Sequence, residues 1–152
     1  MKTTIKVFAV LLYLFLCNQV YAVCNVTATS VNFGAYDVFV TAPDDSTGTI
    51  TILCDRNTNP VRTSISASPN SGGFNPRQMR RTSGAGLRLN YNLFTNAART
   101  TIWGDGTSGT STVSSNARRN RPVTLTIYGR IPAGQDVVTG LYNETLVVTI
   151  AY

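Results

Sequence analysis

The sequence contains no histidine and only seven acidic residues in 152. Without histidine, a Ser-His or Cys-His nucleophile system is excluded, because the imidazole is the general base of both. The acidic residues lie mostly beside Gly, Pro, Asn or Thr, where an Asp side chain hydrogen-bonds nearby backbone in turns. The composition therefore argues against a secreted hydrolase, which needs paired acid and base groups. We expect no enzymatic activity and no cofactor.

Long hydrophobic runs are also scarce. The one apolar run, Val7–Cys17, follows Lys2 and Lys6, and it precedes the small-residue cleavage pattern Val20 and Ala22. This layout predicts a secretory signal peptide over residues 1–22. A retained anchor would need about 20 apolar residues. Lipidation at Cys17 is the less favoured alternative, because Phe15 and Leu16 are bulky for a lipoprotein signal. We expect no membrane-spanning segment after cleavage.

Cysteine is rare as well, with three in the whole chain. Cleavage would leave Cys24 and Cys54, which we expect to form a disulfide in an exported protein. Such a bridge would stabilise the fold by roughly 3–4 kcal/mol in a chain-entropy description. Two free thiols or a metal site are the alternatives, and a zinc site would lack ligands. Residues 23–152 form one predicted domain with eleven arginines, no lysine and a net charge of +4.

Helical periodicity is absent from residues 23–152, and alternating apolar residues are common. Apolar side chains recur with a period of two in five segments: 49–54, 61–67, 87–93, 123–127 and 146–152. Val31 and Phe33 suggest a further, opening strand. This pattern is typical of half-buried antiparallel strands. Dense turn residues between six or seven short strands predict a β-sandwich, with a closed barrel as the alternative. The polar stretch 107–120 is expected to be a long loop or a weak edge strand.

Two further features are interpreted as structural. The segment from Trp103 to Thr107 could hold calcium or a sugar, but one carboxylate is too few for a calcium loop. We expect a tight turn, with Trp103 packed at the edge of the core. The arginines in segments 77–81 and 118–121 could suggest nucleic-acid binding, but the net charge is modest and an exported protein rarely meets nucleic acid. We therefore expect polar strand faces and solvated loops rather than nucleic-acid binding, with a weak attraction to anionic envelope surfaces left open.

Several segments, in order, resemble spore coat protein U domains. They are CNV at 24–26, VNFGAYD at 31–37, TGTITILC at 47–54, LNYNLFT at 89–95, IWGDGT at 102–107, YGRIPAGQ at 128–135 and the last strand to Tyr152. The resemblance covers essentially all of residues 23–152. The family includes secreted coat proteins and pilins of the archaic chaperone–usher pathway. It implies an all-β, immunoglobulin-like sandwich that lacks its last strand.

What the resemblance implies about function is assembly by donor-strand complementation. The partners would be a periplasmic chaperone, an outer-membrane usher and other pilin or coat subunits. The chain would pass through the periplasm to the cell surface, a pilus or the extracellular space. The expected strand-acceptor groove is lined by Val31, Phe33, Leu146, Val148, Ile150 and Tyr152. A closed domain, with these residues in an ordinary core, is the alternative.

Two points bear on the role within a fibre. Only Val23 would precede Cys24 after cleavage, so we expect a strand acceptor rather than a strand donor. The alternative function is a self-complete adhesin or surface-binding module that presents loop residues. Phe39 and Phe74 are its bulky candidates for contact.

Overall fold

The structure, a computed structural model, describes residues 21–83 and 86–152. Most of the predicted signal peptide lies outside these residues. The described residues form nine β-strands and no helix. The strands are β1 (Cys24–Thr29), β2 (Asp44–Cys54), β3 (Thr58–Ile65), β4 (Arg77–Arg81), β5 (Arg88–Phe94), β6 (Val113–Ala117), β7 (Val123–Ile131), β8 (Tyr142–Asn143) and β9 (Val148–Ala151).

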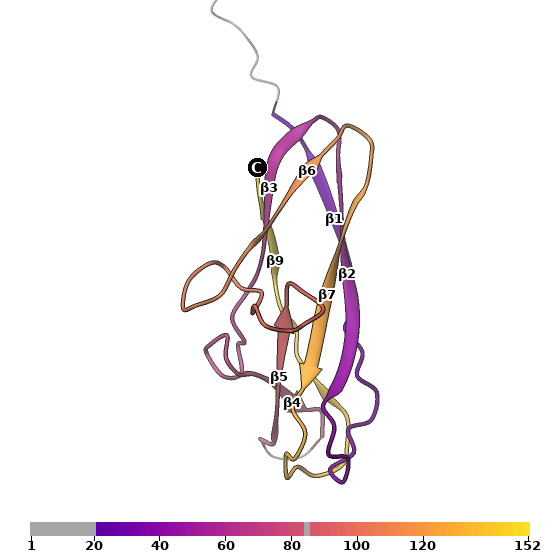
Figure 1. Cartoon of the computed structure of the whole chain (residues 1–152), viewed down its shortest axis with the longest axis vertical. Helices are drawn as coiled ribbons and strands as arrows, with labels where there is room; N and C mark the ends of the chain where they lie inside the picture. Colours follow the sequence, from indigo (N-terminus) through magenta and orange to yellow (C-terminus); the bar gives the residue numbers. More distant parts are fainter. Residues whose placement is uncertain (1–20, 84–85) are drawn as a thin grey trace, which may run out of the picture.

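The strands make an elongated two-layer sandwich (Figure 1). One sheet has six strands in the order β1-β2-β7-β5-β4-β8, and the other has three in the order β6-β3-β9. Neighbouring strands are antiparallel throughout. The predicted immunoglobulin-like β-sandwich is confirmed, and the closed barrel is not formed.

The core follows from alternation along the strands. In β2, Ile50, Ile52 and Cys54 are fully buried, while Thr49, Thr51 and Leu53 point away from the core. Successive side chains of a strand face opposite sides of the sheet, so one apolar face is enough to specify which side is covered. β2 and β7 pair along nine positions, and both strands alternate in burial. This pair therefore determines which face of the six-stranded sheet covers the core.

The opening strand differs from the prediction. Val31 and Phe33 are not in a strand, because β1 spans Cys24–Thr29. The strand ends before a turn in which Asn32 Oδ1 accepts a hydrogen bond from the Gly34 amide at 3.0 Å, and Gly34 has a φ of 74°. Alternation does not reveal β1, because this strand lies at a sheet edge and only Cys24 and Val26 face inward.

The polar stretch 107–120 is an edge strand in part. Its residues 113–117 form β6, which pairs with β3 at the margin of the three-stranded sheet. Edge strands tolerate polar residues on both faces, because one side of the strand meets solvent. The weak-edge-strand alternative is therefore correct for this stretch.

Candidate functional site

A groove opens between two segments that are far apart in sequence. Residues 28–33, which continue from β1, form one wall, and residues 142–148, which join β8 to β9, form the other. The groove has a volume of about 480 Å³. Its floor consists of core side chains from both sheets, namely Ile65, Met79, Tyr91, Leu93 and Ile127.

Four of the six residues expected in the groove line it. Val31, Phe33, Leu146 and Val148 face this space. The remaining two lie elsewhere: Ile150 packs against the core, and the Tyr152 hydroxyl accepts a hydrogen bond from the Cys24 amide at 3.4 Å.

The first wall rests on two glycines in the middle of strands. A Cβ atom at Gly48 would lie 2.9 Å from Val31 Cγ2, and one at Gly129 would lie 2.6 Å from Val31 Cγ1. Phe33 also approaches Gly129, and its ring stands edge-on to the Tyr91 ring with centroids 6.2 Å apart. Glycine in a strand interior often marks such close approach. These two positions therefore let the chain after β1 settle onto β2 and β7.

The second wall is held by a carboxylate. Oε1 of Glu144 accepts hydrogen bonds from the Ser68 hydroxyl and from the Asn70 side-chain amide, the latter at 3.1 Å. Oε2 accepts one from the Tyr91 hydroxyl. Glu144 thus ties the 142–148 segment to the turn after β3 and to β5. Burial, followed by the hydrogen bond to Glu144, raises the pKa of Tyr91, so the phenol stays protonated.

Sequence reasoning missed Glu144, although a signal was present. Tyr142, Glu144, Leu146, Val148 and Ile150 alternate on the inward face of one continuous stretch. A carboxylate on such a face needs partners, because burying it without hydrogen bonds is costly. An inward-facing Glu therefore predicts a local polar network, even though its partners cannot be read from the sequence.

The inward face of this last stretch is only half-buried. All five of its inward residues keep part of their surface exposed, whereas Ile50 and Ile52 of β2 are completely covered. Val31 and Phe33 on the opposite wall are half-buried too. An apolar face of this kind remains partly accessible to solvent, which is the condition for an added strand to bury it.

Free strand edges border the groove. Within the described residues, β1 pairs only with β2, and β9 pairs only with β3. The Ser66 amide donates to the Val147 carbonyl at 2.9 Å, which continues the β3–β9 ladder. Because antiparallel hydrogen bonds alternate along a strand, the backbone groups of Val148 and Ile150 point away from β3.

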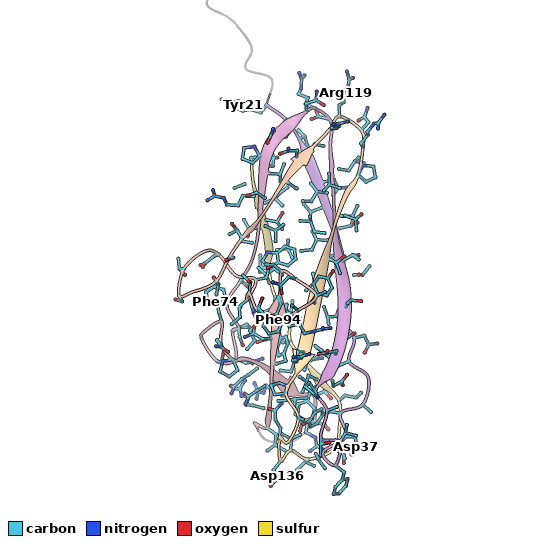
Figure 2. All side chains as sticks on the ribbon, viewed as in Figure 1. Tyr21, Asp37, Phe74, Phe94, Arg119 and Asp136 are labelled. Carbon is cyan, nitrogen blue, oxygen red and sulfur yellow. A yellow bond between two sulfur atoms is a disulfide. The ribbon has the colours of Figure 1, made fainter. Side chains whose placement is uncertain are left out.

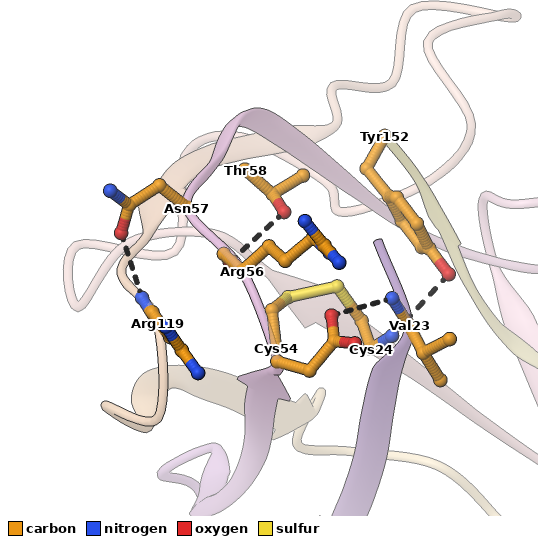
Figure 3. The surroundings of a disulfide bond; sticks show 9 residues. Val23, Cys24, Cys54, Arg56, Asn57, Thr58, Arg119 and Tyr152 are labelled. Carbon is orange, nitrogen blue, oxygen red and sulfur yellow. Dashed lines mark hydrogen bonds between the residues drawn. A yellow bond between two sulfur atoms is a disulfide. The ribbon is translucent and has the colours of Figure 1, made fainter. Parts of the chain in front are cut away.

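The predicted disulfide is present at the other end of β1 (Figure 3). Cys24 and Cys54 are directly opposite in the β1–β2 register, and their sulfur atoms are bonded at 2.00 Å. The Val23 amide donates to Asp55 Oδ1 at 2.8 Å, which extends the pairing one residue beyond the bridge. The bridge therefore secures the start of the strand whose continuation forms the groove wall.

The features interpreted as structural have structural contacts. Trp103 is fully buried, and its indole N–H donates to the Thr63 carbonyl at 3.1 Å. Asp105 accepts from the Thr107 amide at 2.8 Å, so it stabilises the expected turn. Among residues 21–83 and 86–152, no group of three or more His, Cys, Asp or Glu is placed to hold a metal ion. No helix of these residues is long and apolar enough to span a membrane.

One expectation about the arginines is wrong. Arg77 is not solvated but completely buried. Its guanidinium donates to the Ser66 carbonyl, to Asn92 Oδ1 at 2.8 Å and to the Trp103 carbonyl at 2.7 Å. Burial lowers the pKa of Arg77 below its usual value, but these hydrogen bonds stabilise the buried cation. Arg77 therefore joins parts of the fold that are distant in sequence.

Comparison with known proteins agrees with this architecture. The chain matches the Spore Coat Protein U domain over residues 10–149. It is 30% identical over 131 residues to Protein U of Myxococcus xanthus, covering 81% of this chain and 72% of that protein.

Solved structures also resemble this chain. One is a chain in the CsuC–CsuE chaperone–tip adhesion subunit pre-assembly complex of archaic chaperone–usher Csu pili from Acinetobacter baumannii. It matches with a TM-score of 0.59 and 28% identity, over 88% of this chain and 40% of that chain. Another is HdaB, the minor tip subunit of the E. coli Hda pilus, with a TM-score of 0.44 and 16% identity over 83% and 79% of the two chains.

These matches place the protein in a non-enzymatic family, as its lack of catalytic groups led us to expect. This chain spans about two fifths of the length of the Csu chain, so that protein is larger than the unit they share. The family match, in contrast, covers nearly the whole sequence, and the sandwich and its disulfide fit it. The chain belongs to the Spore Coat Protein U domain family.

Proposed function

We propose that this protein is a structural subunit of an extracellular pilus or coat and that its groove accepts a β-strand from another protein. The half-buried inward face of residues 142–150, opposite Val31 and Phe33, carries the proposal. An added strand would bury this face, and it would also bind the free backbone groups of β9. Uncovered strand edges promote aggregation, so a subunit of this kind needs a partner from export onward.

The proposed order of partners is that of the chaperone–usher pathway. A periplasmic chaperone would fill the groove first, and an outer-membrane usher would then exchange it for a neighbouring subunit. The structural relative in the Csu system is described in a chaperone–subunit pre-assembly complex, which supports this order. The protein would therefore be exported, pass through the periplasm and end at the cell surface as an acceptor of a strand.

Two adjacent residues give a matched test. Leu146 lines the groove, whereas the side chain of Val147 points outward and is 63% exposed. We expect Leu146→Asp to abolish co-purification with a co-expressed periplasmic chaperone of a chaperone–usher system, because a charge would enter an apolar interface. Val147→Asp should leave co-purification unchanged. Equal binding by both variants, or a stable wild-type monomer that never binds the chaperone, would refute the acceptor groove.

A second candidate function is contact with a surface through loop residues. Phe39 is 89% exposed and Leu141 is 74% exposed. They lie in loops that also carry Asp37 and Asp136, at the end of the molecule far from Arg119 (Figure 2). The same two loops expose Val40 and Val138 by 48% and 51%, and apolar side chains that gather on a surface mark interaction sites. Phe74, the other predicted contact, instead packs on Arg77, whose guanidinium carbon is 5.3 Å from its ring centre.

This candidate is tested by surface attachment. We expect Phe39→Ala with Leu141→Ala to reduce adsorption of the protein, or biofilm formation by cells that display it, while chaperone binding persists. Phe74→Ala is the control, because its ring is engaged within the fold. Unchanged attachment by the double variant would remove these loops as contacts.

A further inference from the structure

Four arginines gather at the end of the molecule that carries the disulfide. Arg56 lies in the turn between β2 and β3, and Arg118, Arg119 and Arg121 lie in the turn between β6 and β7. All four are exposed. We call this set the arginine pole; Figure 3 shows two of its members, Arg56 and Arg119, beside the disulfide. None of the four arginines lines the groove.

The two turns are fixed against each other. The Arg119 amide donates to Asn57 Oδ1 at 2.9 Å, and the Asn120 amide donates to the Cys54 carbonyl at 2.9 Å. The Arg121 amide donates to the Arg118 carbonyl at 3.0 Å, which closes the second turn. Cys54 is also held by the disulfide. The backbone of the two turns that carry the four arginines is therefore fixed in place.

The charge of the domain is concentrated here. The two turns carry four arginines and one acid, Asp55, a net charge of +3, whereas all of residues 23–152 carry a net charge of +4. Asp55 already accepts a hydrogen bond from the Val23 amide. The ion pairs of the described residues join Arg99 and Arg130 to Asp45, and none involves the arginine pole. Its positive charge is therefore not neutralised within the chain.

The residues around these arginines narrow the kind of partner. Between Cys54 and Val61, and between Ala117 and Val123, the turns contain only Asp, Arg, Asn, Thr and Pro. The turns themselves hold no aromatic side chain on which a nucleic-acid base could stack and no large aliphatic one to enter a lipid layer. The exposed tyrosines at this end, Tyr21 and Tyr152, come from outside the two turns (Figures 2 and 3). Guanidinium groups bind carboxylates through two parallel hydrogen bonds, and Asn amides bind hydroxyl groups.

We propose that the arginine pole binds an acidic polysaccharide, with arginines on the carboxylates and Asn57, Asn59 and Asn120 beside the sugar hydroxyls. The pole is separate from the groove, so a polymer can bind whether or not a strand fills that groove. The subunit would then attach to an anionic sugar matrix by one end while it is assembled through another surface.

Binding of the full exported chain to immobilised alginate tests the proposal, with uncharged dextran as the reference surface. We expect the protein to bind alginate and not dextran. Binding to alginate should weaken as salt is added, because exposed charges are screened. Arg119→Ser with Arg121→Ser should weaken it about tenfold, and lysine at both positions should restore part of the loss, since it keeps the charge without the planar fork.

The control removes the same charge elsewhere. Arg80 and Arg88 face each other across β4 and β5. Arg88 lies four residues beyond Asn92, the partner of Arg130 in β7. The pair is therefore more than about 30 Å from Arg121 by strand rise, beyond the screening length. Arg80→Ser with Arg88→Ser should leave alginate binding within about twofold.

Specific outcomes would overturn the proposal. They are equal binding to dextran and alginate, an equal loss in both serine variants, or tighter binding to anionic lipid vesicles or to a single-stranded oligonucleotide than to alginate. Thermal unfolding checks that each variant is folded. If the Arg119 and Arg121 variant is not, Arg56→Ser supplies the same comparison, and its failure to weaken binding counts equally against the proposal.

Discussion

Glu144 is the residue on which the second groove wall depends. Its carboxylate accepts hydrogen bonds from Ser68, Asn70 and Tyr91, so its removal leaves several partly buried donors without an acceptor. We expect Glu144→Ala to lower the free energy of unfolding by about 3 kcal/mol. Chemical denaturation measures this loss.

Glutamine is the matched control at this position. Its side chain would keep one acceptor oxygen for Ser68 and Asn70, and the Tyr91 hydroxyl could accept from its amide. We therefore expect Glu144→Gln to recover at least half of the stability that alanine removes. If alanine cost no more than glutamine, the carboxylate would not be the tie that holds residues 142–148.

Asp45 predicts a dependence of stability on pH. Its carboxylate receives two hydrogen bonds from Arg130, at 2.7 and 2.8 Å, and these, aided by Arg99, hold the pKa of Asp45 below its usual value. A lowered folded-state pKa gives stability that is present above the unfolded-state value, about 3.9, and lost as pH falls through the folded-state value. We expect Asp45→Asn to lose at most about 1 kcal/mol, because the pair is partly exposed.

The pH profile of that variant is the measurement. The difference in unfolding free energy between wild type and Asp45→Asn should be complete near neutral pH and shrink below about pH 4. Asp44 works in the opposite sense, because burial and then the charge of Asp45 raise its pKa. A difference that grows as the solution is acidified would contradict the role given to Arg130.

Single residues also show where sequence reasoning stops. The Asp105 turn was predicted correctly, because a turn motif is a local feature. Trp103 was expected at the edge of the core but is completely buried in it. The burial of Arg77 was not predicted, since its acceptors on Ser66, Asn92 and Trp103 come together only in the folded chain. A charge pattern along one segment cannot reveal a buried cation whose partners lie in three others.

At the scale of elements, a substitution at Gly129 in β7 tests whether the first groove wall depends on its close packing against this strand. A methyl group there would approach Val31 to 2.6 Å and Phe33 to 2.7 Å. We expect Gly129→Ala to destabilise the protein by about 1–3 kcal/mol, by displacing the chain after β1 from the sheet. Hydrogen exchange should then be faster in residues 28–33 than in the wild type.

Gly73 provides the control for this substitution. A Cβ atom at Gly73 would have no neighbouring heavy atom within 4 Å, and its φ does not require glycine. Gly73→Ala should change stability by no more than about 0.5 kcal/mol. If the two alanine variants were equally stable, the close approach of Val31 to Gly129 would not contribute to the free energy of unfolding.

The strands divide into those that alternation reveals and those that it does not. β2, β5, β7 and β9 were predicted in place, because each has an apolar face that packs against the core. β1 and β6 lie at sheet edges, where one apolar face is short or missing. The same holds for the groove. Leu146 and Val148 could be predicted from alternation, but the floor residues come from several strands and are brought together only in the folded sandwich.

At the scale of the whole molecule, three features surround one weakly covered region. The disulfide fixes the start of β1, the glycines seat its continuation, and Glu144 anchors the opposite wall. These groups position both walls of the groove before any strand binds. Because the walls are already in place, little free energy would be lost in ordering them when a strand binds, which favours tight association.

A strand appended to the C-terminus tests whether the groove is a missing strand position. A segment of about ten residues, joined to Tyr152 by an Asn-Gly turn, could pair antiparallel with the outward backbone groups of Val148 and Ile150. We expect a monomer whose melting temperature is higher by about 10 °C, because alternate apolar side chains would cover Leu146 and the groove floor. Shifting the segment by one residue would turn those side chains to solvent and should remove the gain. If neither extension changed the melting temperature of an already monomeric wild type, the sandwich would be complete without a donor.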